Sequence, residues 1–244
     1  MSEEIKIAMW SGPRNISTAL MYSFDNRDDC IAIDEPLYAH FLKSTGTNHP
    51  NAKKIIQNEE TEIDIVISNL LGPNPRSKPI WYQKHMCHHI SDDHDLSWTN
   101  NLRNCFLIRN PREVLLSLSR VTDSIDIRAT GLQQQKRILE NISQFLGETP
   151  PIVDSNDILE NPKLILSKLC ESLGIPFSNQ MLSWEPGPRN CDGIWANDWY
   201  ESVWKSSGFL QPKSRNSELN AILSEVFSEA MPIYQELREM RIRP

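Results

Sequence analysis

The sequence predicts an α/β fold with a central parallel β-sheet and helices on both of its faces. Short, mostly apolar runs predict strands at Ile5 to Trp10, Cys30 to Ile33, Pro79 to Gln83, Cys105 to Ile108 and Pro151 to Val153. The intervals between these runs are long enough for helices. Strands that alternate with helices form parallel sheets, because each crossover helix packs on a face of the sheet.

The first element of this pattern is a strand, a tight loop and a helix. The β-branched run Ile5 to Trp10 is followed by Ser11-Gly12-Pro13, which indicates a turn. Ile16, Leu20, Met21 and Phe24 then recur at helical spacing. The second predicted strand meets Asp34-Glu35-Pro36, helical stretches continue to Leu71, and a Pro-rich connector spans residues 72–79.

Two later helices have clear start signals. Asn110 and Asn161 are each followed by proline, which predicts an N-cap residue with proline at the first helical position. The second of these helices is expected to end near Gly174, where glycine favours the left-handed stop. We then expect a tryptophan-rich loop or lid at residues 184–216 and an amphipathic helix at 217–240, all within a single domain spanning 1–244.

Composition limits the possible partners. Lys and Arg number 25 against 32 Asp and Glu, a net charge of −7, which argues against a general nucleic-acid binder. No window approaches the roughly 20 apolar residues of a membrane span, and the N-terminus is acidic, so we expect a cytoplasmic protein that does not contact a membrane. Five scattered cysteines without a CxxC pair predict reduced thiols. The oligomeric state stays open.

The loop from Ser11 to Thr18 has the composition of an anion site. It places successive backbone N–H groups, the hydroxyls of Ser17 and Thr18 and the Arg14 guanidinium at a predicted helix N-terminus, which favours phosphate or sulfate. It lacks the second glycine and the lysine of a Walker A loop. The alternative is an ordinary turn with exposed hydroxyls.

A second candidate motif follows the fourth predicted strand. That strand is followed by Arg109, where a magnesium-dependent NTPase would have an aspartate. Asp34, at the end of the second predicted strand, is the only candidate for the metal-binding carboxylate. Ser117 lies eight residues beyond Arg109 on the helix that Pro111 begins, so both groups can reach one further phosphate. The pattern favours a metal-free anionic nucleotide. The alternatives are a magnesium-dependent P-loop kinase or NTPase, or a structural pair between Arg109 and Glu113.

Taken together, the two motifs resemble those of sulfotransferases that use 3′-phosphoadenosine 5′-phosphosulfate. The resemblance extends over roughly residues 5 to 180 and includes Asp154 to Pro162 and Leu173 to Phe177. Trp10 to Leu20 with Asp34 to Ala39 is similar to a sulfotransferase-like branch, some of whose members carry an aminotransferase-like name. The resemblance implies a three-layer α/β/α fold of the P-loop nucleoside triphosphate hydrolase type, this nucleotide as co-substrate, no metal, and a small-molecule acceptor with a hydroxyl or amine. The residues implied to bind the co-substrate are Gly12, Pro13, Arg14, Asn15, Ile16, Ser17, Thr18, Arg109 and Ser117.

The implied chemistry needs a cation near the bridging oxygen and a base for the acceptor. Arg14 suits the first role, because a guanidinium stabilises charge without giving up its proton. Glu35 and His85 compete for the second. His85 follows the third predicted strand, in a segment that resembles the family's Lys-Thr-His stretch. Glu35 is favoured, since its strand is expected to lie beside the first strand and thus opposite Arg14.

Other features of the sequence bear on the function, on metal binding and on the C-terminal third of the chain. The Asn15-Ile16 pair stands where many related loops carry glycine, so a non-catalytic nucleotide-binding module with the same fold is an alternative function. The group His85, Cys87, His88, His89 and His94 lacks the spacing of a zinc site. Lys205 to Gly208, or Arg189, is a candidate for the family's C-terminal basic loop. The tryptophans and Tyr200 indicate either a lid over an acceptor with ring-like faces or simple packing.

Overall fold

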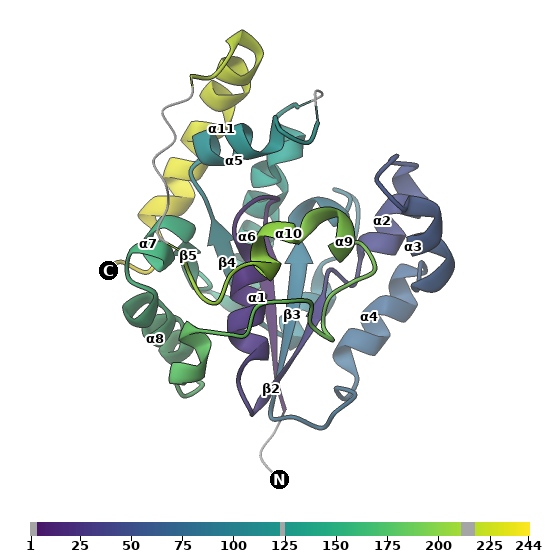
Figure 1. Ribbon diagram of the computed structural model, residues 1–244, viewed down its shortest axis with the longest axis vertical. Coiled ribbons are helices and arrows are strands. Elements are labelled where there is room, and N and C mark those ends of the chain that lie inside the picture. The colour runs from purple at the N-terminus through teal and green to yellow at the C-terminus, as the bar shows by residue number, and fades with distance from the viewer. Residues whose placement is uncertain (1–3, 123–124, 211–217) are drawn as a thin grey trace.

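The computed structural model describes residues 4–122, 125–210 and 218–244, and its centre is a parallel five-stranded sheet (Figure 1). The strand order is β2-β3-β1-β4-β5, and all four pairings are parallel. The strands are β1 (Ile5–Ser11), β2 (Cys30–Asp34), β3 (Ile80–Met86), β4 (Arg103–Ile108) and β5 (Ile152–Asp154). The predicted α/β class and its parallel sheet are confirmed.

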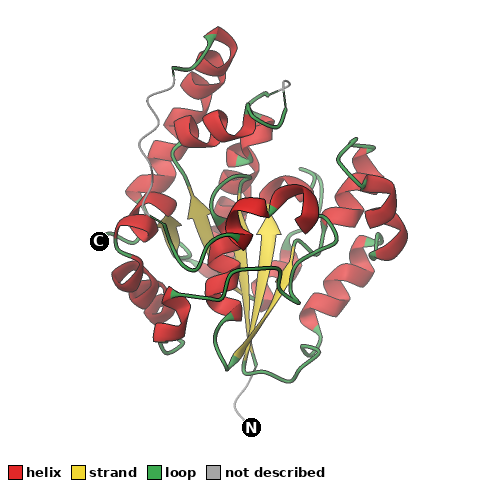
Figure 2. Cartoon of the chain, viewed as in Figure 1, coloured by secondary structure: helices red, strands yellow, loops and turns green. Residues whose placement is uncertain are grey.

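Helices cover both faces of this sheet, as Figure 2 shows. In β1, Ile7 and Met9 belong to one buried cluster, whereas Ala8 and Trp10 belong to a second cluster on the opposite face. This alternation follows from the two-residue period of a strand. The described helices are α1 (Ser17–Asp25), α2 (Tyr38–Thr45), α3 (Ala52–Asn58), α4 (Ile63–Leu71), α5 (Pro111–Leu118), α6 (Leu132–Leu146), α7 (Ser155–Glu160), α8 (Pro162–Ser172), α9 (Ala196–Trp199), α10 (Glu201–Trp204) and α11 (Ala221–Glu239), with 3₁₀ turns η1 (Cys87–His89), η2 (Ser97–Asn101), η3 (Arg128–Thr130) and η4 (Asn179–Leu182).

The predicted helix starts are confirmed. The side chains of Asn110 and Asn161 accept hydrogen bonds from the backbone N–H groups of Arg112 and Leu164, so each is an N-cap. Gly174 has φ of 64°, the left-handed stop expected after α8. Proline at the first helical position fits both helices, because its missing N–H would have no partner there.

Two predictions about the strands are wrong. The third strand does not end at Gln83 but continues to Met86, because the polar residues Lys84 and His85 are buried within it. The second strand does not lie beside the first, since β3 is inserted between β2 and β1. Lys84 and His85 consequently point to opposite faces of the sheet.

The segment after α8 is more ordered than a loop. It contains α9, α10 and a bridge between Ser183 and Gly208. The final helix begins at Ala221, capped by the side chain of Asn220. Of the predicted domain, residues 1–3, 123–124 and 211–217 lie outside the described residues. Among these, 211–216 belong to the predicted lid and 217 to the predicted final helix. Among the described helices, none combines the length and the apolar character that crossing a membrane requires.

Candidate functional site

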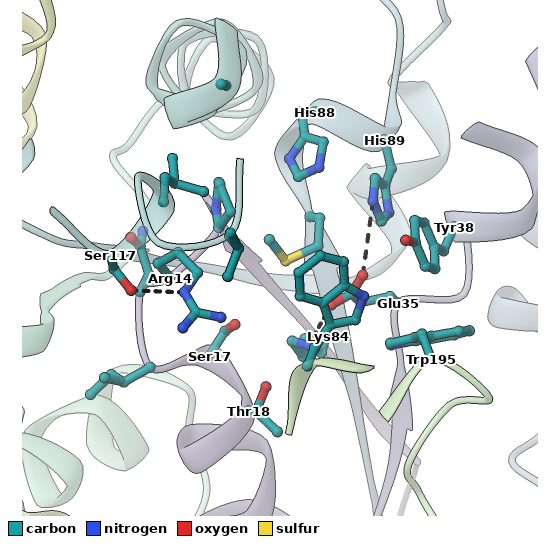
Figure 3. A pocket seen from close by; sticks show the side chains of 18 of the residues that line it. Arg14, Ser17, Thr18, Glu35, Tyr38, Lys84, His88, His89, Ser117 and Trp195 are labelled. Carbon is teal, nitrogen blue, oxygen red and sulfur yellow. Dashed lines mark hydrogen bonds and ion pairs between the residues drawn. The ribbon is translucent and has the colours of Figure 1, made fainter. Parts of the chain in front are cut away.

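A cavity of about 1320 Å³ opens at the carboxyl ends of the strands, where ligands bind in open α/β sheets. Its wall is formed by the loop before α1, by α2, η1 and α5, and by the segment with α9 and α10. Residues far apart in the chain therefore meet at one place (Figure 3).

The loop between β1 and α1 forms a backbone concavity. Arg14 and Ile16 have φ of 60° and 61°, so the left-handed conformation is adopted without glycine. Left-handed residues occur in anion-binding nests, in which successive N–H groups point inward, and Arg14 and Ile16 lie directly before the helix N-terminus at Ser17. The loop thus keeps the local shape of an anion site although Asn15-Ile16 replaces a glycine-containing pair.

The neighbours of this loop explain its other residues. A Cβ atom on Gly12 would lie 2.4 Å from the Thr130 carbonyl oxygen, so glycine is required by the close approach of that segment. The buried Asn15 side chain donates a hydrogen bond of 3.1 Å to the Leu107 carbonyl, which ties the loop to β4. Gly12 is therefore structural here, and it does not line the cavity.

The two sequence motifs are joined directly. Arg14 Nε donates to Ser117 Oγ at 2.9 Å, and Arg109 Nη1 donates to the Arg14 carbonyl oxygen at 2.7 Å. Arg109 also pairs with Glu113 at 3.6 Å, so its structural pairing and its place in the cavity wall coexist. The remaining predicted co-substrate residues, Pro13, Asn15, Ile16, Ser17 and Thr18, line the same wall.

Opposite this wall stands a buried group of charges around Lys84. Its Nζ donates to Asp34 Oδ1 at 2.8 Å, to Glu35 Oε1 at 2.6 Å and to Tyr200 Oη at 2.7 Å. Only 1% of the Lys84 side chain is exposed. Burial by itself would lower the pKa of Lys84, but the neighbouring carboxylates raise it well above its usual value, so the lysine stays charged.

Glu35 lies at the carboxyl end of β2 and faces the cavity. Burial raises the pKa of its carboxyl group, and the Lys84 ammonium opposes that shift. Its second oxygen, Oε2, is 3.8 Å from His89 Nε2. Glu35 has φ of 38°, a strained conformation that the ion pair with Lys84 helps to hold.

His85 is not placed as expected. It lies within β3 on the opposite face from Lys84, where it stacks on Trp10 with ring centroids 4.5 Å apart. Burial lowers its pKa to about 3, and it does not line the cavity. The expectation that His85 follows the third strand is therefore wrong, because β3 continues past it to Met86. A position outside the cavity wall does not support the predicted role of His85 as the base.

Sequence reasoning missed the residues that surround Glu35 instead. Lys84 belongs to the segment that resembles the family's Lys-Thr-His stretch, and His89 belongs to the group that lacks the spacing of a zinc site. In the described part of the chain, no group of three or more His, Cys, Asp or Glu residues is placed to hold a metal. The signal that could have identified Lys84 is a lysine that continues a buried strand towards an Asp-Glu pair.

Some aromatic residues of the tryptophan-rich segment line the cavity, and others attach the segment to the rest of the protein. Trp195, Trp199 and Tyr200 line the cavity, whereas Trp184 is buried against Tyr22 in the core. Trp204 Nε1 donates to Asp192, which also accepts from Tyr22 Oη, and this fixes the segment to α1.

Of the two candidates for a basic C-terminal loop, only the segment from Lys205 to Gly208 contributes residues to the described cavity wall. Ser206 and Gly208 line it. Lys205 is exposed and pairs with Glu201, and Arg189 pairs with Asp25 at the far end of α1 from the phosphate loop.

Comparison with known proteins identifies relatives for nearly the whole chain. The model of the family described as sulfotransferase domain matches residues 5–241. Branched-chain-amino-acid aminotransferase-like proteins 2 and 1 of Arabidopsis thaliana are 35% and 34% identical over 237 and 242 residues. These alignments cover 95% and 98% of this chain but 41% and 42% of the relatives, so the chain spans about two fifths of their length.

Solved structures show the same fold at low sequence identity. A sulfotransferase from Alicyclobacillus acidocaldarius has a TM-score of 0.55 at 10% identity, with 99% of this chain and 98% of that chain covered. The sulfotransferase domain from the curacin biosynthetic pathway has a TM-score of 0.53 at 15% identity, with 95% and 99% covered. The sulfotransferase domain of the Synechococcus PCC 7002 olefin synthase has 0.51 at 14% identity, with 94% and 95% covered.

Proposed function

Because this chain belongs to the sulfotransferase domain family, we propose that it transfers a sulfuryl group from 3′-phosphoadenosine 5′-phosphosulfate to a hydroxyl or amine of a small-molecule acceptor. The observation that carries the proposal is the joining of the two phosphate motifs. Arg14 bonds to Ser117 and Arg109 bonds to the Arg14 carbonyl, on a cavity wall that faces Glu35.

The residues on this wall suit an anionic nucleotide. The loop before α1 offers backbone N–H groups at a helix N-terminus, two hydroxyls and Arg14. Arg109 precedes α5, and Ser117 lies in the last turn of that helix. We assign the 5′-phosphosulfate to the loop and the 3′-phosphate to Arg109 and Ser117, because charge-assisted hydrogen bonds from guanidinium groups favour such oxygens. When bound, the co-substrate supplies the activated sulfuryl group. Arg14 then stabilises the negative charge that develops on the leaving oxygen.

Glu35 is the proposed general base. Its Oε1 is held by Lys84, which leaves Oε2 to accept the proton of the acceptor hydroxyl or amine. Burial raises the pKa of Glu35 towards the range in which a carboxylate is an effective base near neutral pH. His85 is not retained for this role, since it lies outside the cavity.

A magnesium-dependent kinase or NTPase is not favoured. Asp34, the one acidic candidate for holding the metal, accepts hydrogen bonds from Lys84, Tyr200 and the backbone N–H of Gly193. A magnesium ion there would have to displace a buried ammonium group. The third possibility, a binding module without turnover, is separated from the proposal only by an activity assay.

Ligand binding tests the proposal first. Adenosine 3′,5′-bisphosphate should raise the melting temperature and ATP with magnesium should not, because a ligand that binds only the native state stabilises it. By calorimetry, Arg109→Ala should weaken bisphosphate binding by about 2 to 4 kcal/mol and Ser117→Ala by about 1 kcal/mol. Arg243→Ala, on an exposed side chain, is the control and should bind like the parent.

Two results would contradict the assignment. Stabilisation by ATP with magnesium but not by the bisphosphate would point to a kinase or NTPase. If both variants bound the bisphosphate like the parent, Arg109 would have only a structural role, the ion pair with Glu113. A radiolabelled-sulfate transfer assay with phenols, alcohols and amines then separates an enzyme from a binding module.

A further inference from the structure

Glu35, the proposed base, lies beside a buried cation. Figure 3 shows Lys84 and His89 on two sides of its carboxylate. Lys84 Nζ is 2.6 Å from Glu35 Oε1, whereas His89 Nε2 is 3.8 Å from Oε2. An ammonium group at hydrogen-bond distance favours the charged carboxylate and lowers its affinity for a proton. Paired with Lys84 alone, Glu35 would be a weak base.

Asp34 shares this ammonium group. Lys84 Nζ lies 2.8 Å from Asp34 Oδ1, so the two carboxylate oxygens that it bonds are within about 6 Å of each other. Like charges at such a distance repel, and each disfavours the ionised form of the other. When both are ionised, two carboxylates surround one ammonium group, and the buried group carries one excess negative charge.

Hydrogen bonds from distant segments hold Asp34 in this place. Its Oδ1 accepts from Lys84, and its Oδ2 accepts from Tyr200 Oη at 2.7 Å and from the backbone N–H of Gly193 at 3.2 Å. Only 1% of the Asp34 side chain is exposed. Three donors stabilise a carboxylate in its charged form. Asp34 therefore keeps its negative charge while Glu35 gains or loses a proton.

Lys84 has no second hydrogen for Glu35. An ammonium group has three N–H donors, and those of Lys84 bond to Asp34, Glu35 and Tyr200. The hydrogen bond that Lys84 gives to Glu35 is therefore limited to Oε1. The Glu35 side chain is 13% exposed and lines the cavity, so a proton can reach it from there.

The other titratable side chains on this side of the cavity are uncharged at neutral pH. They are Tyr38, His49, His88, His89 and Tyr200. Burial raises the pKa of both tyrosines and lowers that of each histidine, so all five are neutral near pH 7. Among the described residues on this side, the ammonium group on β3 and the carboxylate of Asp34 are thus the charges that act on Glu35.

We propose that Asp34 is a positioning residue that keeps Glu35 able to accept a proton, because it shares Lys84 and adds a second negative charge beside the base. This inference rests on the proposed function for the role of Glu35. As the acceptor oxygen or nitrogen bonds to sulfur, its proton passes to Glu35, and the bond from sulfur to the bridging oxygen breaks with its electron pair left on the phosphate. Protonation of Glu35 leaves Asp34 and Lys84 as one balanced ion pair. The proton transfer thus removes the excess charge from the buried group.

Titration of Glu35 by carbon NMR tests the inference without any turnover. The protein is labelled with carboxyl-labelled glutamate, and the Glu35 signal is assigned by its loss in Glu35→Gln. In the parent, the pKa of Glu35 should lie above the ordinary value of glutamate. In Asp34→Asn this pKa should fall by about one to two pH units, because one negative charge is removed while the ammonium group stays. Asp198→Asn, at an exposed carboxylate that bonds Asn51, is the matched control and should leave the pKa unchanged.

Turnover gives a second measurement once the sulfate-transfer assay has found an acceptor. In Asp34→Asn, the rise of turnover with pH should move to lower pH by the same amount as the pKa of Glu35. The turnover reached at high pH should fall about three- to tenfold, because a weaker base removes the proton less readily. A merely structural role of Asp34 would lower turnover without moving the midpoint of this rise. Asp198→Asn should match the parent in both respects.

The outcomes separate this inference from the proposed function. A Glu35 pKa that is unchanged or raised in Asp34→Asn would overturn the inference. If Asp34→Asn does not fold, the titration of the parent decides: a Glu35 pKa below the ordinary value of glutamate would show that Lys84 outweighs Asp34, and it would overturn the inference as well. A protein that shows the expected fall in pKa yet transfers no sulfate would contradict the proposed function and leave the effect of Asp34 on Glu35 standing.

Discussion

Replacing Lys84 by methionine should destabilise the protein strongly. The substitution keeps the length and most of the volume of the side chain, so little of the effect comes from a cavity. It removes the ammonium group that lies 2.8 Å from Asp34 and 2.6 Å from Glu35, in a place where only 1% of the lysine side chain is exposed. Two neighbouring buried carboxylates would lose the cation that stabilises their charged forms.

The expected loss is about 3 to 5 kcal/mol, the range measured when one partner of a buried ion pair is removed. A chain of 244 residues unfolds with an entropy of about 0.5 kcal/mol/K. The melting temperature should therefore fall by about 6 to 10 °C.

The deficit should depend on pH with a definite sign. Without the ammonium, the pKa of Glu35, already raised by burial, rises further. A carboxyl group whose folded-state pKa exceeds its unfolded value costs stability above the unfolded pKa and nothing below it. The difference between Lys84→Met and the parent should thus be smallest near pH 4 and reach its full size near pH 7. Asp34→Asn added to Lys84→Met should recover part of the loss.

Urea denaturation across this pH range measures the effect. Lys205→Met is the matched control, because Lys205 also pairs with a glutamate but is exposed, and it should leave the free energy of unfolding near that of the parent. A Lys84→Met deficit no larger than that of the control, or one that is constant from pH 4 to pH 7, would refute the reasoning.

Three further predictions concern the same site. Turnover should rise with pH, with a midpoint above the ordinary pKa of glutamate, because only ionised Glu35 can accept a proton. Glu35→Gln should lower turnover roughly 10²- to 10⁴-fold and abolish this rise. If the rise with pH persisted in the variant, the base would be another residue. Gly12→Ala should lower thermal stability by about 1 to 3 kcal/mol, because its Cβ would meet the Thr130 carbonyl, and an unchanged melting curve would show that the contact relaxes freely. Tyr200→Phe should cost about 1 to 3 kcal/mol in urea denaturation, because its hydroxyl bonds both Asp34 and Lys84; a neutral effect would mean that water replaces it.

Local signals in the sequence were sufficient for much of the fold. The cap at Asn110, the stop at Gly174 and the strand, loop and helix around Gly12 depend on neighbouring residues, so short stretches of sequence specify them. The two phosphate motifs belong to the same class, because strand ends in a parallel sheet lie at one edge. They meet in one cavity because β1 and β4 are neighbouring strands, a pairing that only the structure shows.

The sequence alone determined the α/β class, the helix caps and the two motifs of Arg14 and Arg109, whereas only the tertiary structure decided what surrounds Glu35. The order β2-β3-β1 inserts Lys84 between Asp34 and the phosphate loop, and the continuation of β3 turns His85 to the opposite face. In a sequence, a polar residue such as Lys84 indicates the end of a strand, because its buried partners are not visible there. These partners are Asp34, at the end of β2, and Tyr200, which is 116 residues away from Lys84 in the sequence. Ion pairing and burial between such distant segments determine the charge of each group, because both depend on the assembled neighbours rather than on the local sequence.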